Sequence, residues 1–132
     1  MGDRIKIACA TDDEIHLTKD HFGSAKFYLI YELDKATKQV SFIEKIVNSS
    51  PEEKEHGDPK KARSVSSILK DAKVLLCCAM GKNVVRMRKK YCPVISRETN
   101  IKKALLLLKE KYDELAQETQ RTPDENREII RV

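Results

Sequence analysis

The stretch Lys73–Ala79, KVLLCCA, is a short run of apolar residues that ends shortly before Gly81. A continuous apolar run of this length, closed by glycine, predicts a strand buried on both faces. The preceding segment opens with Asp58-Pro59, a capping residue followed by proline, and carries an apolar stripe, so it predicts a helix over Pro59–Asp71. A helix that leads into a buried strand is a crossover connection, which predicts an α/β fold with a parallel pair of strands.

Three strands are predicted before this crossover, at Arg4–Ala10 (RIKIACA), Lys26–Leu33 (KFYLIYEL) and Gln39–Val47 (QVSFIEKIV). The short turn DKATK separates the second from the third, which predicts an antiparallel hairpin. The buried strand is expected to join the first strand on the side away from the hairpin. A fifth strand is predicted at Pro93–Ser96, near an edge because proline cannot donate to a ladder. The expected strand order is therefore 3-2-1-4-5.

Helices account for much of the remaining chain. A second helix is predicted over Asn83–Tyr91, and a third runs from an N-cap at Thr99 through Leu115. The pair Thr122-Pro123 carries another capping signature, which predicts a short C-terminal helix through Arg131.

The chain of 132 residues is long enough for one hydrophobic core, so one domain is expected at 1–117, followed by a tail at 118–132. Together the elements predict an α/β sandwich of two or three layers around a mixed five-stranded sheet. No apolar run approaches the roughly 20 residues that cross a bilayer, and the start leads directly into a strand. We therefore expect a cytoplasmic protein without membrane contact.

The formal net charge of +5 is modest, and acidic residues are interleaved with basic ones, which argues against a nucleic-acid partner. The exception is the run 82–90, where Lys82, Arg86 and Lys89 could contact an anion or a protein partner. The four cysteines lack the spacing of a disulfide framework, so they are expected to be free thiols.

Residues able to bind a soft metal follow strands that end at one edge of the predicted sheet, namely His16, His21, His56, Cys77 and Cys78. Ligand sites of α/β sheets lie at the carboxyl ends of the parallel strands. Thiolate and imidazole ligands suit iron, zinc, copper or an iron–sulfur cluster. The chain has no C-x-x-C and no H-E-x-x-H motif, so spacing alone leaves a metal site and scattered histidines with packed thiols equally open.

The four thiols have different expected surroundings. Cys9, inside the first strand, is expected in the core, and Cys92 is expected at the opposite edge of the sheet. Because successive residues of a strand face opposite sides, Cys77 and Cys78 cannot both reach one ion while the strand continues. One of these two is therefore expected to pack.

Three motifs carry a resemblance to a known family: IKIACATDD at the first strand, DHFGSAKFYLIYEL, and SILKDAKVLLCCAMGKNVVRMRKKYCPVI. Together they resemble the dinitrogenase iron–molybdenum cofactor biosynthesis family, small proteins of the NifX and NafY type, over about residues 4 to 115. The resemblance implies a ribonuclease H-like fold. It also implies binding or transfer of an iron–sulfur or iron–molybdenum-type cluster, or of a single soft transition metal.

By this resemblance His21 corresponds to the characteristic histidine of the family, while Phe22 and Gly23 shape its loop and Met80-Gly81 forms a turn. Without the resemblance, His21 is explained better as a loop residue that hydrogen-bonds the backbone to hold the turn.

The chain departs from the family pattern in two places. Cys77 and Cys78 stand where relatives usually have small residues, so they supply either a thiolate ligand or bulkier packing. Only His56-Gly57 remains of a loop that is rich in histidine and glycine in many relatives. The reduced loop favours a general metal or cluster binder over a role specific to nitrogenase.

The resulting hypothesis is a non-catalytic binder or carrier of a metal or metal–sulfur cluster, with ligands from His21 and one of Cys77 or Cys78, supported by His56 or His16. Its partners would be proteins that donate or accept the cluster, and a homo-oligomer could complete the coordination. The alternative is a protein or nucleic-acid interaction module that uses the basic helix 82–90, with thiols that only pack.

Two catalytic interpretations are weaker. A nuclease needs carboxylates on the central strands to hold two metal ions, and neither Ile7–Ala10 nor Cys77-Cys78 supplies one. A thiol redox role would require a disulfide between adjacent cysteines, which closes a strained ring. We therefore expect a protein that is not an enzyme.

Overall fold

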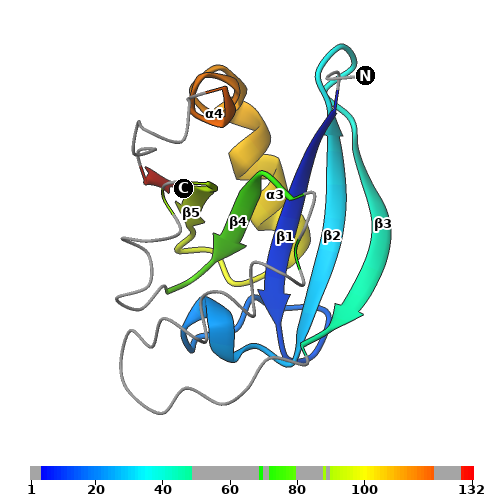
Figure 1. The fold of residues 1–132 in the computed structure, drawn as a ribbon, viewed down its shortest axis with the longest axis vertical. Coiled ribbons are helices and arrows are strands. Elements are labelled where there is room, and N and C mark those ends of the chain that lie inside the picture. The colour runs from blue at the N-terminus through cyan, green and yellow to red at the C-terminus, as the bar shows by residue number, and fades with distance from the viewer. Residues whose placement is uncertain (1–3, 49–68, 70–71, 80–87, 89, 121–128) are drawn as a thin grey trace.

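The computed structural model describes residues 4–48, 69, 72–79, 88, 90–120 and 129–132. Its strands are β1 (Arg4–Thr11), β2 (Phe27–Asp34), β3 (Val40–Val47), β4 (Val74–Cys77), β5 (Cys92–Ile95) and β6 (Ile130–Arg131). A single turn of 3-10 helix, η1 (Phe22–Ser24), precedes β2, and the helices α3 (Ile101–Glu110) and α4 (Tyr112–Thr119) follow β5. The strands form one mixed sheet in the order β3-β2-β1-β4-β5-β6 (Figure 1).

The strand β1 lies at the centre of this sheet because it is apolar on both faces. It pairs antiparallel with β2 from Arg4↔Asp34 to Thr11↔Phe27, and parallel with β4 through Cys9↔Leu76. The first five strands therefore follow the predicted order 3-2-1-4-5, and the α/β class is confirmed.

The predicted number of five strands is wrong, because a sixth strand pairs with β5. Ile130 lies opposite Val94 in a parallel register and is buried. Its branched side chain is more favourable in a strand than at the end of the predicted helix. The prediction of a helix through Arg131 fails at this point. The division at residue 117 stays a prediction, although α4 continues beyond it.

The strand β5 lies near the edge of the sheet, as predicted, but it is paired on both sides because β6 forms the edge. Its proline is tolerated because of where the missing N–H would point. The amide of Cys92 donates to Lys73 on the β4 side, so the nitrogen of Pro93 faces the other way, toward β6. Pairing with β6 begins only at Val94, so no ladder bond is lost.

The third predicted helix is present as two segments that meet at Lys111, where the backbone leaves helical geometry at φ −101°, ψ 28°. The N-cap is Asn100 rather than the predicted Thr99. The side-chain oxygen of Asn100 accepts the amide of Lys103 at 3.0 Å, which satisfies one of the free donors of the first turn.

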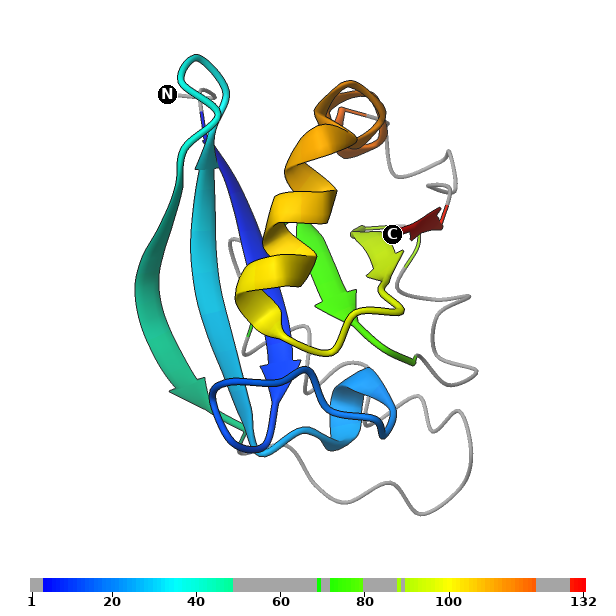
Figure 2. The same ribbon diagram turned by 180° about the vertical axis from the view of Figure 1, so that it is seen from behind.

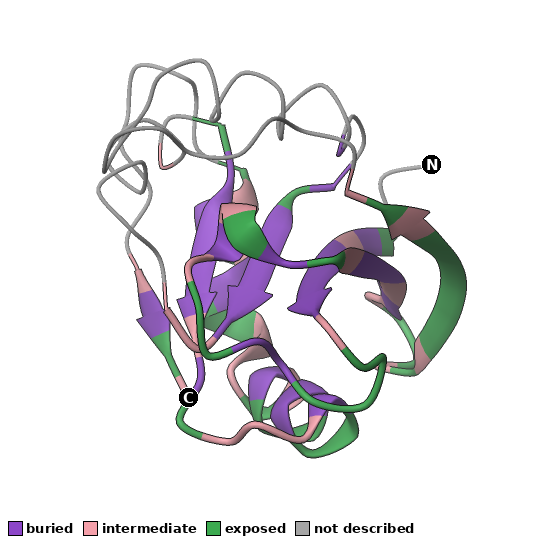
Figure 3. Ribbon diagram, turned by 90° about the horizontal axis from the view of Figure 1, so that it is seen from below, coloured by how far each residue is buried: buried purple, intermediate pink, exposed green. Residues whose placement is uncertain are grey.

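The helices α3 and α4 cover one face of the sheet with a buried stripe of Ile101, Ala104, Leu105, Leu108 and Leu115. A second core on the other face contains Phe22, Tyr28, Leu75, Cys77 and Tyr91, together with Leu69 and Ala72. Buried residues gather on the inner strands, whereas β3 is largely exposed (Figure 3).

Most of the predicted helices 59–71 and 83–91 lies outside the described residues. In the part of the chain that is described, every helix is too short or too polar to span a bilayer.

Candidate functional site

The candidate site is the rim of the sheet at the carboxyl ends of β1 and β4. These strands are parallel, so both end at the same edge, and residues 12–26 fold across it as a loop (Figures 1 and 2). The amide of Phe22 donates a hydrogen bond to the carbonyl of Ala79 at 3.1 Å. This bond attaches the histidine-bearing loop to the segment that directly follows β4.

The loop around Phe22 is held at several further points. The ring of Phe22 is buried and stacks on Tyr28 with ring centres 5.0 Å apart, and the hydroxyl of Tyr28 donates to the carbonyl of Phe22 at 3.1 Å. The side-chain amide of Asn48 donates to the carbonyls of Gly23 at 2.9 Å and Ala25 at 2.7 Å. The position of η1 is thus fixed by buried packing and by donors from β2 and from the end of β3.

His21 is the residue from which η1 begins. Its backbone is extended, at φ −58° and ψ 148°, and its carbonyl accepts the amide of Ser24 at 2.9 Å. The imidazole makes no capping hydrogen bond to η1, and the residue is half-buried. The backbone of His21 thus lies at the point where the loop meets the segment after β4.

The adjacent cysteines face opposite sides of the sheet, as the alternation of a strand requires. Cys77 is enclosed in the core away from α3, where its thiol donates to the carbonyl of Val94 at 3.8 Å, and burial raises the pKa of this thiol. Cys78 is half-buried and packs against the core beneath α3. Among the described cysteines, Cys78 alone retains exposed surface, because Cys9 and Cys92 are buried as well.

Two charged residues act on the thiol of Cys78. Burial raises its pKa above the ordinary range, the ammonium of Lys19 lowers it, and the carboxylate of Glu98 raises it. Lys19 lies on the loop before His21, and Glu98 follows the parallel strand β5. The sequence analysis did not single out either residue, although the rule that placed the cysteines at this rim also places the segment after β5 there.

His16 is held by a different set of contacts. Its Nδ1 lies 2.8 Å from Oδ2 of Asp13, and the backbone bridges to Asn100 at the start of α3. Hydrogen bonds from the amide and the ring of His16 and from the amide of Ile15 hold the pKa of Asp13 well below its usual range. His16 thus belongs to an exposed turn of the same loop that contacts the start of α3.

The remaining predicted residues lie outside the described part of the chain, namely His56, Met80, Gly81, Lys82, Arg86 and Lys89. Within the described ranges, histidine, cysteine, aspartate and glutamate form no group of three or more that could hold a metal ion. The structure therefore brings the loop of His21 to the segment of Cys78 and places Cys77 in the core. The assignment of ligands stays a prediction.

The strand order and the rim define a small α/β domain whose loops gather at the carboxyl ends of parallel strands. The sequence model of the family described as dinitrogenase iron-molybdenum cofactor matches residues 3–111, and the chain belongs to this family. This finding confirms the resemblance drawn from the sequence.

A solved structure shows the same fold. It is an NMR structure of a NifB-like protein from Thermotoga, described as belonging to the DUF35 family. The two chains are 17% identical with a TM-score of 0.51, and the alignment covers 80% of this chain and 88% of the Thermotoga chain. No curated protein matches the chain.

Proposed function

We propose that the protein is a non-catalytic carrier that binds a metal–sulfur cluster at the rim formed by the loop of His21 and the segment of Cys78. The observation that carries this proposal is the hydrogen bond from Phe22 to Ala79, which joins the residue after the loop histidine to the residue after a partly exposed cysteine. Membership of a family named after the iron–molybdenum cofactor supports a cluster of that kind as the cargo.

The donor atoms favour a cluster over a single ion. A structural zinc ion takes four protein ligands, whereas the described rim residues form no group of three. In a cluster, bridging sulfides supply much of the coordination of each metal. One thiolate and one imidazole therefore supply a larger share of the protein ligands that are needed. His56, Met80 or a second subunit would complete the set.

The local charges suit a cargo that is loaded and released. Lys19 favours the thiolate of Cys78, and burial and Glu98 oppose it, so that the pKa of the thiol is raised on balance. A bound metal adds its own positive charge and drives deprotonation of the coordinating thiol. Binding is thus coupled to the loss of a proton from Cys78.

A carrier without catalysis agrees with the acids near the rim. Asp12 follows β1, but its carboxylate accepts the amide of Lys26 at 2.9 Å and the hydroxyl of Thr18 at 2.9 Å, which fixes the loop. The end of β4 presents cysteine where two-metal hydrolysis would need a carboxylate. The order of β1 to β5 supports the ribonuclease H-like fold as part of this proposal, and we place the carrier in the cytoplasm.

The test is metal loading under anaerobic conditions. The protein is offered iron with sulfide, molybdate with sulfide, copper or zinc, and bound metal is measured together with visible absorption. We expect the parent to retain a sulfide-containing cargo, and His21→Ala and Cys78→Ser to lose it. Cys92→Ala is the matched control, because this thiol lies at the other end of the parallel strands. Unchanged metal content in both rim variants would contradict the proposal.

A further inference from the structure

The helices α3 and α4 cover only part of one face of the sheet. In Figure 2 the helix α3 crosses the middle of the sheet, and β3 lies to one side of it. The register places Val40, Phe42 and Val47 opposite Leu33, Tyr31 and Phe27, which all face the α3 side. The side chains of Phe42 and Val47 are nevertheless 54% and 62% exposed. Among the described residues, no helix covers this part of the sheet.

A bulge in the hairpin keeps these residues on one face. The register shifts between Ile30 and Tyr31, so that Ile43 is an extra residue on β3. Without this insertion, Val47 would face the side opposite Phe42, because the side chains of a strand alternate. The bulge therefore places Val40, Phe42 and Val47 on the α3 side of β3, where Lys45 lies between Phe42 and Val47.

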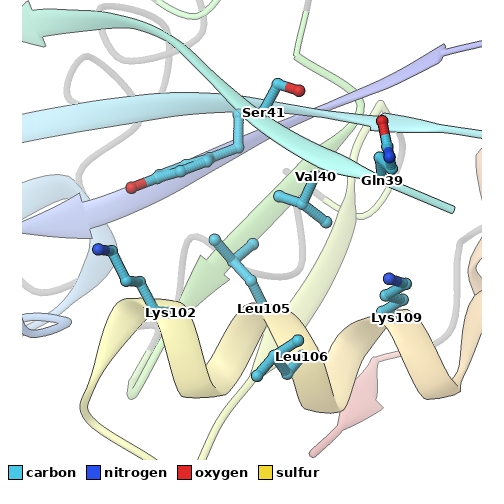
Figure 4. Close-up of a pocket in the computed structure, with 8 residues that line it drawn as sticks. Gln39, Val40, Ser41, Lys102, Leu105, Leu106 and Lys109 are labelled. Carbon is cyan, nitrogen blue, oxygen red and sulfur yellow. The ribbon is translucent and has the colours of Figure 1, made fainter.

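A groove of about 520 Å³ lies between α3 and the start of β3, where Gln39, Val40 and Ser41 line it. Its floor is apolar, with Tyr31 and Val40 from the sheet and Leu105 and Leu106 from the helix (Figure 4). Leu106 lines the groove from the helix side and is 62% exposed. Exposed apolar side chains that line a groove are typical of an interaction site.

The groove carries positive charge at both ends. Lys102 and Lys109 line it on either side of the leucines, and their separation of seven residues corresponds to two helical turns, roughly 10 Å. Within the described part of the chain, neither ammonium forms an ion pair. Lys38, at the end of the hairpin, lies over the ring of Tyr112 and adds a third positive charge nearby.

We propose that this groove binds an amphipathic, acidic helix of a partner protein. The apolar face of that helix would pack on Leu106 and Phe42, and two carboxylates one heptad apart would pair with Lys102 and Lys109. Lying beside α3 at the usual spacing of 8–10 Å, it would complete the helical layer over β3.

Two other occupants fit less well. A second copy docked through the same groove would place lysines against lysines, which opposes association. A small molecule would fill the groove but leave the exposed side chains of Phe42 and Val47 uncovered. The extent of the apolar surface favours a macromolecular segment, and the charge favours an acidic one.

The probe is a pair of synthetic helical peptides of about five turns with the same leucine stripe. One carries glutamates seven residues apart along its flanks, and the other carries lysines at those positions. Calorimetry with the full chain should detect binding of the glutamate peptide only, weakened on the order of tenfold between low and high salt. The double variant Lys102→Glu/Lys109→Glu should reverse the preference. Lys103→Glu, on the same helix but outside the groove, is the matched control and should bind as the parent does.

The binding surface is mapped separately by NMR and by Leu106→Ser. This exposed position should tolerate the substitution, so a loss of binding reports on contact and not on folding. Equal binding of both peptides, or chemical shift changes confined to the rim of His21, would overturn the proposal. So would a concentration-dependent dimer that protects the same groove, since the occupant would then be a second copy. Metal loading of the lysine variants should equal that of the parent. Peptide binding at the groove can therefore be judged independently of the proposed metal binding at the rim.

Discussion

The amide of Phe22 donates to the carbonyl of Ala79 across 3.1 Å, and this single bond joins the loop after β1 to the segment after β4. Neither residue contributes its side chain to the bond, so many sequences could make it. The side chains instead decide how rigid the junction is. Phe22 is packed in the core, which fixes the backbone next to His21.

Alkylation of the native protein should modify one cysteine. Cys78 retains exposed surface, whereas burial encloses the other three thiols and raises the pKa of Cys9 and Cys77. Because the thiolate is the nucleophile, the buried cysteines should react only after unfolding. Intact-mass spectrometry after iodoacetamide should show one adduct in buffer and four in denaturant. Modification of Cys77 at a rate similar to that of Cys78 would contradict the described core.

The rate of that reaction should respond to the two neighbouring charges. Removal of the ammonium in Lys19→Gln raises the pKa of Cys78 further and should slow alkylation at a fixed mildly alkaline pH. Removal of the carboxylate in Glu98→Gln lowers the pKa and should accelerate it. Rates measured over a pH series separate a pKa effect from altered access, because only the former disappears when the thiol is fully ionised.

Tyr28→Phe should destabilise the fold by about 0.5–1.5 kcal/mol, the usual net contribution of one hydrogen bond. The hydroxyl of Tyr28 donates to the carbonyl of Phe22 inside the core, and the substitution leaves that oxygen without this donor. Urea denaturation followed by circular dichroism measures the difference. Tyr112→Phe serves for comparison because this residue lies on α4, away from the loop; equal effects of the two substitutions would argue against the contact.

Asn48 should tolerate alanine better than aspartate. Asn48→Ala removes donors to the carbonyls of Gly23 and Ala25, at a cost of about 1–3 kcal/mol for two hydrogen bonds. Asn48→Asp places a carboxylate against the same oxygens, which adds repulsion once the acid is ionised. Its penalty should therefore grow as the pH rises through about 4, the ordinary pKa of aspartate. A pH-independent penalty would show that the amide does not face these carbonyls.

Asp13 should contribute to stability above the acid range. Its pKa is lowered in the folded protein by hydrogen bonds from His16 and Ile15, so its stabilising effect is present above the unfolded value of 3.8. That effect is lost as the pH falls through the lower folded value. The parent should thus lose stability below about pH 4 relative to Asp13→Asn, by a small amount because the carboxylate is exposed. Asp20→Asn, an exposed position on the same loop, is the control; a flat difference from pH 6 to 2 would refute the assignment.

The inner strands could be predicted from the sequence because their signal is local. Continuous apolar runs identified β1 and β4, and the short turn between alternating runs identified the hairpin. The sixth strand could not be found in this way. A strand of two residues shows too little hydrophobic periodicity to be recognised. Ile130 becomes a strand residue only because β5 offers a free edge. The N-cap was displaced by one residue for a similar reason, since Thr99 and Asn100 are both good capping residues.

The rim was predicted in outline, because topology alone brings the ends of parallel strands together. The burial of Cys77 and the exposure of Cys78 were not predictable, since a strand fixes only that the two face opposite sides. The effect of Lys19 and Glu98 on Cys78 could not be predicted, because no sequence motif marks a charge that acts through space from another loop.

The stacking of Tyr28 on Phe22 has a practical consequence in a chain that contains no tryptophan. Intrinsic emission comes from four tyrosines alone, and one of them lies directly beneath the loop that bears His21. A coloured cargo at the rim would quench this residue by energy transfer, and a loosened loop would change its surroundings. Under the proposed function, tyrosine emission would therefore report loading of the rim without any label.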